Sequence, residues 1–164
     1  MKKRNKIKEI SYYEHEVTKE EMKESMVKLL KDRDDGAFVN FAFNLLNSKV
    51  YTVANERILL SLDKEGNIPN ERVMDFEILH KFKLYNVDEK RWIPIFLSKE
   101  DALEAEPPND AVVVGLEFYY LCERMLVLAD LEGFNIDPLD IGLRLTKEYI
   151  EAICKIKEIV DKED

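Results

Sequence analysis

The chain has 164 residues, of which 46% are apolar and 36% are charged, a balance typical of one globular domain rather than of a disordered chain. The formal net charge of −9 is unevenly placed, because residues 1–8 carry five positive charges and no negative one. Residues 9–164 therefore carry a net charge of −14. A body this acidic repels phosphate backbones, which excludes nucleic acid as the expected partner.

The sequence predicts a cytoplasmic protein that does not bind a membrane. No segment approaches the ~18 consecutive apolar residues that span a bilayer, and the basic start lacks the apolar stretch of a signal peptide. Cys122 and Cys154 lie in apolar helical runs, where buried free thiols are common. We interpret residues 1–16 as a solvated basic tail and residues 17–164 as a single domain.

The first expected helix spans residues 18–33 and begins with a capping box formed by Thr18 and Glu21. Its outward face is charged, and its inward face is a narrow apolar stripe made up of Met22, Met26, Leu29 and Leu30. The stripe has to be covered, either by the chain's own domain or by a second copy. Since a short loop leads to the next helix, we expect packing on its own domain, in a monomer or a weak homodimer.

A buried helix and two strands are expected next. Residues 37–46 (AFVNFAFNLL) carry two neighbouring apolar stripes, which is typical of a helix that fills a core. Residues 49–54 and 58–62 have the β-branched and aromatic content of strands.

A long hairpin is predicted over residues 76–97. Residues 76–87 alternate between apolar and polar positions, whereas residues 92–97 are apolar on both faces and predict an interior strand. The two arms must be antiparallel because only a tight turn joins them. Pro94 cannot donate a backbone hydrogen bond, which predicts a bulge or an unpaired side at that position.

The second half of the chain predicts alternating helices and strands, beginning with a short helix capped by Ser98. The elements expected after it are a strand at 111–114, a helix at 115–130, strands at 133–136 and 141–145, and a final helix that Thr146 caps and that ends near residue 160. This order predicts the α+β class: a single domain in which a mixed, mostly antiparallel sheet packs against helices, with later strands able to add in parallel.

Two segments resemble the N-terminal domain of the SseB family, the enhanced-serine-sensitivity proteins. They are residues 92–103 (WIPIFLSKEDAL), and residues 133–138 (GFNIDP) followed by a helix reading LTKEYIEAI. The resemblance covers about residues 38–155. Leu97 replaces a small polar residue of the family pattern, and Asp137 stands where an asparagine precedes the proline. The resemblance implies this fold and a cytoplasmic location, and it brings no catalytic residues with it.

The sequence offers little for catalysis or metal binding. The only histidines and cysteines are His15, His80, Cys122 and Cys154, none at a metal-binding spacing. The DRDDG stretch lacks the glycine and glutamate positions of a calcium loop, and neither a phosphate-binding glycine cluster nor a nucleophile elbow occurs. His80 falls on the apolar face of its predicted strand, which favours a core histidine over a catalytic base. We expect no metal, no cofactor and no enzymatic activity.

Two functions remain open. The first is a non-enzymatic module that recognises a protein partner, with the acidic surface favouring a basic one. Its interface would use four amphipathic aromatic residues, for which core positions are the competing interpretation: Tyr85, Trp92, Tyr119 and Tyr120. The second, prompted by the resemblance, is a small-molecule sensor or an enzyme linked to amino-acid metabolism. Its pocket would lie near the turn at Asp137 and Pro138, where strand ends and helix starts meet.

Overall fold

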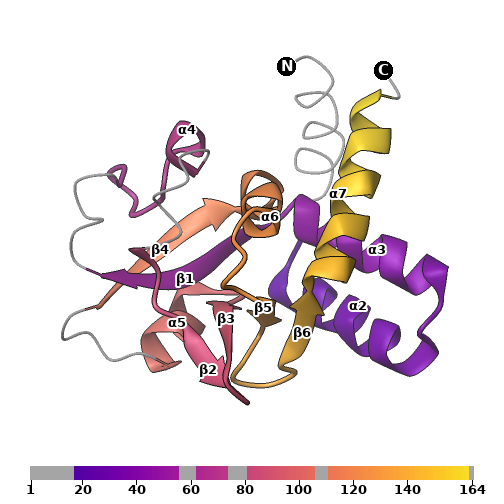
Figure 1. Ribbon diagram of the computed structural model, residues 1–164, viewed down its shortest axis with the longest axis horizontal. Helices are drawn as coiled ribbons and strands as arrows, with labels where there is room; N and C mark the ends of the chain where they lie inside the picture. The colour runs from indigo at the N-terminus through magenta and orange to yellow at the C-terminus, as the bar shows by residue number, and fades with distance from the viewer. Residues whose placement is uncertain (1–16, 56–61, 74–80, 106–110, 163–164) are drawn as a thin grey trace.

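The structure, a computed structural model, describes residues 17–55, 62–73, 81–105 and 111–162 (Figure 1). Its strands are β1 (Lys49–Asn55), β2 (Tyr85–Val87), β3 (Lys90–Ile95), β4 (Ala111–Glu117), β5 (Gly133–Ile136) and β6 (Leu143–Thr146). Its helices are α2 (Lys19–Asp32), α3 (Asp35–Leu46), α4 (Asn70–Val73), α5 (Lys99–Ala105), α6 (Phe118–Leu126) and α7 (Lys147–Lys162). The predicted α+β class and the single domain are confirmed.

The strands form two sheets, a four-stranded one in the order β2-β3-β5-β6 and a two-stranded one of β1 and β4. All pairs are antiparallel except β3 and β5, which run in parallel, as expected for a later strand reached through a helix. Within the described part of the chain, a single bridge joins the sheets, where the amides of Tyr51 and Phe96 each donate to the other residue's carbonyl, at 3.0 and 2.7 Å.

Pro94 explains why the two sheets meet at only one bridge. β2 pairs with β3 no further than Trp92, so Pro94 has an unpaired side, as the sequence predicted. Its ring removes the amide that a continuous ladder would need. The Pro94 carbonyl instead accepts a hydrogen bond of 2.6 Å from the Thr52 hydroxyl, a buried side chain of β1. A side chain therefore supplies the contact that the backbone cannot make.

One face of the four-stranded sheet forms the floor of the main core. Its buried residues come from three neighbouring strands: Ile93, Ile95, Phe134, Ile136 and Leu145. They pack in one cluster with apolar residues of α3, α6 and α7, and the rings of Phe118 and Phe134 meet edge to face at 5.2 Å. Figure 1 shows α2, α3 and α7 grouped beside β6, with β1 and β4 on the opposite side.

The first helix matches its prediction closely. Thr18 accepts from the amide of Glu21 at 3.1 Å, and the Glu21 carboxylate accepts from the amide of Thr18 at 3.0 Å, so the capping box is formed. Met22 and Met26 are buried in the main core, as expected for a stripe that packs on its own domain. The stripe does not stay buried along its whole length, because Leu30 is 43% exposed.

Three sequence predictions need correction. The second apolar stripe of α3 consists of Val39, Phe43 and Leu46. Only Leu46 is buried, because Val39 and Phe43 face away from the packed side and are exposed. The strand predicted at 111–114 continues to Glu117, since it pairs along its full length with β1, so the following helix begins only at Phe118 and ends at Leu126. The long strand predicted at 76–87 is a strand only from Tyr85 within the described residues.

Several predictions fall outside the described residues and have no structural outcome. They concern the basic tail at residues 1–16, which contains His15, most of the strand expected at 58–62, and His80.

Candidate functional site

The four aromatic residues predicted as an interface lie in two separate places. Tyr85 and Trp92 are paired in the β2–β3 ladder, whereas Tyr119 and Tyr120 follow each other on α6 with ring centroids 5.1 Å apart. Trp92 and Tyr119 are buried, and the other two are partly buried. Trp92 and Tyr119 thus hold core positions, the interpretation that the sequence had left open against an exposed interface.

The contacts of Tyr119 and Trp92 account for their burial. The Tyr119 hydroxyl donates to the carboxylate of Asp161, and the Lys157 ammonium lies 4.1 Å from the centre of the Tyr119 ring, so this ring joins α6 to α7. The Arg144 guanidinium lies 5.7 Å from the centre of the Trp92 ring, across the sheet from β6. Both residues therefore stabilise the fold.

Asp137 builds a turn instead of opening a pocket. It is 1% exposed and has a left-handed φ of 56°, which aspartate tolerates better than most residues. Its amide donates to the Ile95 carbonyl at 2.8 Å, and its own carbonyl accepts from the amide of Gly142 at 2.7 Å. Its carboxylate accepts from the amide of Ile141 at 3.3 Å. Asp137 thus directs the chain through Pro138 into β6, and its polar atoms are occupied within the fold.

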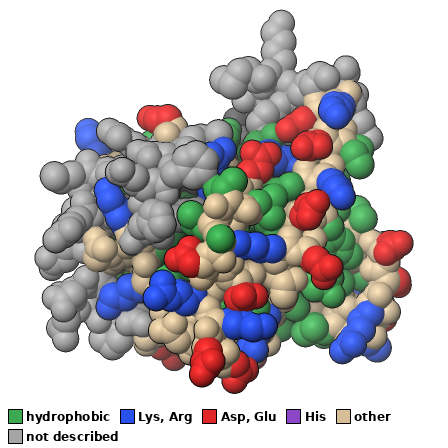
Figure 2. Space-filling model, viewed as in Figure 1, with side chains coloured by type: hydrophobic (Ala, Val, Ile, Leu, Met, Phe, Trp, Pro, Cys, Tyr) green, Lys and Arg blue, Asp and Glu red, His purple; other side chains and the backbone are tan. Residues whose placement is uncertain are grey.

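A groove begins directly after this turn and is the best candidate site among the described residues. Its volume is about 670 Å³. We call it the β6 groove, and its lining residues come from the α2–α3 elbow, from the β6 segment and from the start of α7: Leu29, Leu30, Arg33, Asp34, Asp35, Phe38, residues 141–145, Tyr149 and Ala152. Figure 2 shows hydrophobic side chains gathered between α7 and the α2–α3 pair.

The β6 groove runs along the edge of a strand. Among the described strands, β6 is the last of its sheet and is bound to β5 on one side only. Successive side chains of a strand point to opposite faces, so a cleft over one face would be lined by every second residue. Here three consecutive strand residues, Leu143, Arg144 and Leu145, line the groove, together with the two residues that precede the strand. This continuous lining is what a strand presents when its edge, with its row of backbone amides and carbonyls, is exposed.

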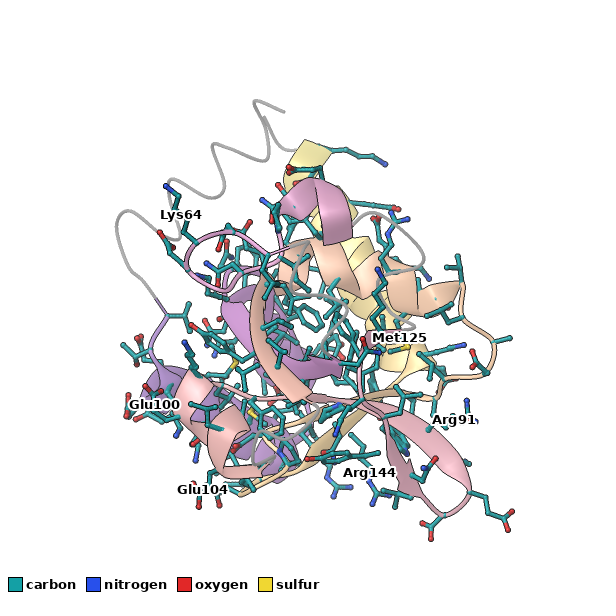
Figure 3. All side chains as sticks on the ribbon, turned by 90° about the vertical axis from the view of Figure 1, so that its left-hand side faces the viewer. Lys64, Arg91, Glu100, Glu104, Met125 and Arg144 are labelled. Atoms are coloured by element: carbon teal, nitrogen blue, oxygen red, sulfur yellow. The ribbon has the colours of Figure 1, made fainter. Side chains whose placement is uncertain are left out.

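The walls of the groove are apolar, with charges of both signs. Leu30 and Tyr149 are 43% and 51% exposed, and the Tyr149 ring lies 6.0 Å from that of Phe38. Arg33 and Asp35 line the groove at the α2–α3 elbow, and Arg144 lines it from β6 (Figure 3). The Asp34 carboxylate is already used, because it caps α3 by accepting from the amide of Ala37 at 2.7 Å.

Ion pairs hold the α2 wall in place. The Lys19 ammonium lies 2.8 Å from a carboxylate oxygen of Asp101 on α5, whose Glu100 and Glu104 point outward (Figure 3). The Lys23 ammonium lies 2.8 Å from the Asp140 carboxylate and 3.6 Å from that of Asp137. The hydrogen bond to Asp140, and the nearby charge of Asp137, raise the pKa of Lys23. The pairs of Lys23 connect α2 to the turn that precedes β6, and the pair of Lys19 connects it to α5.

The described residues form neither a metal-binding group nor a membrane-spanning helix. Within residues 17–55, 62–73, 81–105 and 111–162, no three His, Cys, Asp or Glu side chains gather in a group that could hold a metal ion. Over the same residues, every helix is too short or too polar to cross a membrane. The groove therefore presents a strand edge between largely apolar walls.

The chain matches no family model, no curated protein and no solved structure. The SseB resemblance of residues 92–103 and 133–138 therefore stays a prediction. Sequence reasoning also missed the groove, although one signal pointed to it. Leu30 ends a stripe that the sequence said had to be covered, and it is at Leu30 that the stripe leaves the core and reaches the groove.

Proposed function

We propose that this chain is a non-enzymatic binding module that holds an extended segment of a protein partner in the β6 groove. The observation that carries the proposal is the lining of the groove by three consecutive residues of β6, Leu143, Arg144 and Leu145, at the edge of the described sheet that faces away from β5. An extended peptide can add to such an edge as a further strand, with backbone hydrogen bonds supplying affinity and side-chain pockets supplying specificity.

The walls of the groove favour a segment with apolar side chains, and the overall charge of the chain favours a basic one. Leu30 and Tyr149 stand on opposite walls and offer apolar surface to side chains that alternate along an extended peptide. The chain's net charge of −9 draws a basic partner toward it by long-range attraction. Asp35 is the lining carboxylate that remains to meet a basic side chain, since Asp34 caps α3.

We also propose that the protein is cytoplasmic and belongs to the SseB family. The support is the resemblance of residues 92–103 and 133–138, and the absence of a candidate membrane span among the described helices. Burial of Met22 and Met26 in the chain's own core favours a monomer, with weak self-association left to the exposed end of the α2 stripe.

The experiment that tests peptide binding is selection from a random peptide library displayed on phage, followed by fluorescence anisotropy with the enriched peptides. We expect Leu30→Ala and Tyr149→Ala each to weaken binding about tenfold, the loss of a moderate hot spot. Ile159→Ala is the matched control, because Ile159 lies on the same helix as Tyr149 and is similarly exposed but does not line the groove. Equal affinity for all three variants would contradict the proposed site.

Amide hydrogen exchange tests the proposed geometry independently of side chains. If a peptide adds to the edge of β6, outward-facing amides within Leu143–Thr146 become protected when it binds. Binding without any new protection in β6 would mean that the peptide does not pair with the strand.

A small-molecule ligand is the second candidate function. The groove volume of about 670 Å³ supports it, because ligand pockets usually measure about 300–1,000 Å³. Its residues 141 and 142 also lie just after the turn at Asp137 and Pro138, where the sequence predicted a pocket. A thermal-shift screen against amino acids and nucleotides tests this candidate, since a ligand at about 100 times its Kd stabilises a protein by about 2.7 kcal/mol. A flat screen would count against a sensor or enzyme of amino-acid metabolism.

A further inference from the structure

We propose that Cys122 and Cys154 form a redox-active dithiol, which a hydroperoxide closes into a disulfide between α6 and α7. The observation behind this proposal is a distance of 3.6 Å between the two sulfur atoms, which come from residues 32 positions apart in the sequence. The site is separate from the β6 groove, because neither cysteine lines it.

The two thiols are placed to react with each other. Cys122 lies on α6 and Cys154 on α7, two helices that pack together. The Cys154 thiol donates a hydrogen bond to the Cys122 sulfur, and the Cys122 thiol donates to the Tyr119 carbonyl at 3.5 Å. A disulfide bond is about 2.05 Å long, so the sulfurs have to approach by roughly 1.5 Å, which is within reach of small side-chain rotations.

The surroundings assign different roles to the two cysteines. Cys154 is 6% exposed whereas Cys122 is completely buried, so a small oxidant meets Cys154 first. When Cys154 is ionised, the Cys122 thiol can donate to its sulfur, and this hydrogen bond lowers the pKa of Cys154. The positive charge of Lys157 acts in the same direction, against burial and the charge of Glu123. The pKa of Cys122 is raised by its hydrogen bond with Cys154 and by burial. Since the thiolate is the reactive form, Cys154 is the nucleophile.

The reaction with hydrogen peroxide balances as follows. The Cys154 thiolate attacks one peroxide oxygen, the O–O bond breaks, and the departing hydroxide takes up a proton to become water. Cys154 is then a sulfenic acid. The Cys122 sulfur attacks the Cys154 sulfur, the S–O bond breaks, and the Cys122 proton leaves with the hydroxyl group as a second water. The two thiols are oxidised by two electrons, and the peroxide is reduced to two waters.

Burial explains why the oxidant is a hydroperoxide. A disulfide such as oxidised glutathione has to bring a bulky group in line with the attacked sulfur. Cys154 is only 6% exposed, which hinders the approach of such a group, whereas hydrogen peroxide is close to water in size. The resulting bond would fix α7 to α6, the two helices that Tyr119 and Asp161 already join.

The test is oxidation of the full chain with hydrogen peroxide, followed by intact mass measurement and peptide mapping. We expect a loss of two hydrogen atoms, one peptide pair linked through Cys122 and Cys154, and return to the starting mass with dithiothreitol. In Cys122→Ala the sulfenic acid on Cys154 cannot be resolved, and it is trapped by dimedone once the peroxide has been removed and the chain has been unfolded in denaturant. In Cys154→Ala the buried Cys122 stays a thiol under the same conditions.

Two results would overturn the proposal. One is a wild-type chain that remains folded and keeps both thiols, or oxidises Cys154 to sulfinic acid, without forming the disulfide. The other is faster reaction at Cys122 than at Cys154 in the single variants. The wild-type mass decides the question by itself if either alanine variant fails to fold.

Discussion

The two edges of β6 differ sharply in the space around them. Toward β5 the strands lie so close that a Cβ atom on Gly133 would sit 1.8 Å from the carbonyl oxygen of Leu145. Away from β5, the same strand borders a groove of about 670 Å³. One edge is closely packed and the other borders open space, so under the proposed function variants at the two edges should have separable effects on unfolding and on binding.

The largest expected effect is at the closed edge, in Gly133→Ala. The added methyl group meets backbone atoms of β6 that cannot move away, so β5 and β6 would have to separate. We expect a loss of about 3 kcal/mol or more in the free energy of unfolding, the upper range for overpacking. Chemical denaturation monitored by circular dichroism measures it.

Gly36→Ala is the matched control for this prediction. Gly36 lies in α3, and the nearest neighbour of a methyl group added there would be a carboxylate oxygen of Asp34 at 3.5 Å, an ordinary contact. Alanine favours the helix, so this variant should gain up to about 1 kcal/mol. Similar stability of the two variants would mean that the β5–β6 contact is looser than the structure has it.

The next effect concerns the turn at Asp137, which leads the chain into β6 between β5 and the groove. Asp137→Ala removes the acceptor for the Ile141 amide and puts alanine at a left-handed φ of 56°. Together these changes should cost about 2 kcal/mol. Asp137→Asn should cost less than about 1 kcal/mol, because asparagine tolerates this conformation and keeps an acceptor oxygen. Equal losses in the two variants, measured by denaturation, would contradict the role assigned to the turn.

At the open edge we expect a small effect on stability and a large one on binding. Tyr149 is half exposed, and its ring contact is with Phe38, so Tyr149→Ala should lower the free energy of unfolding by only about 1 kcal/mol. Its neighbour Ile150 is fully buried, and Ile150→Ala should cost about 2–5 kcal/mol. Thermal and chemical denaturation measures the stability of these two variants, and fluorescence anisotropy measures the peptide affinity of Tyr149→Ala. Together the measurements separate a contribution of Tyr149 to binding from the contribution of Ile150 to stability.

Local signals in the sequence predicted the local structure well. The capping box of Thr18 and Glu21 and the cap at Ser98 are formed, because such bonds depend on residues three positions apart. The burial of Met22 and Met26 also followed from helical spacing. Local signals did not predict the end of β4, because the length of this strand is set by its pairing with β1, which is distant in the sequence.

The groove could not be predicted in the same way. It forms where the α2–α3 elbow, β6 and α7 converge, and no pattern within one segment encodes that convergence. Amphipathic aromatic residues were a poor guide, since the side chains of Trp92 and Tyr119 suit a core as well as an interface. Neither Asp137 nor Pro138, at which the sequence placed a pocket, lines the groove, whose lining begins at Ile141 after the turn.

The smallest effect concerns the ion pairs that hold the α2 wall. The hydrogen bond of Lys23 with Asp140 and the nearby charge of Asp137 raise the pKa of Lys23 above the ordinary value of 10.5. A raised pKa in the folded state means that the contribution to stability is complete below 10.5 and is lost as the pH rises through the folded value. Lys23→Met should therefore cost roughly 0.5 kcal/mol at neutral pH, and the difference from wild type should shrink above a pH of 10.5.

Lys28→Met is the control for the ion-pair prediction. Lys28 lies on the same helix, so its replacement makes the same change in net charge without removing the contacts to the β6 turn. Denaturation curves collected across the alkaline range compare the two variants. If both follow the same pH dependence, general charge repulsion explains the effect, and the pairing of Lys23 with Asp140 does not anchor the open edge of β6.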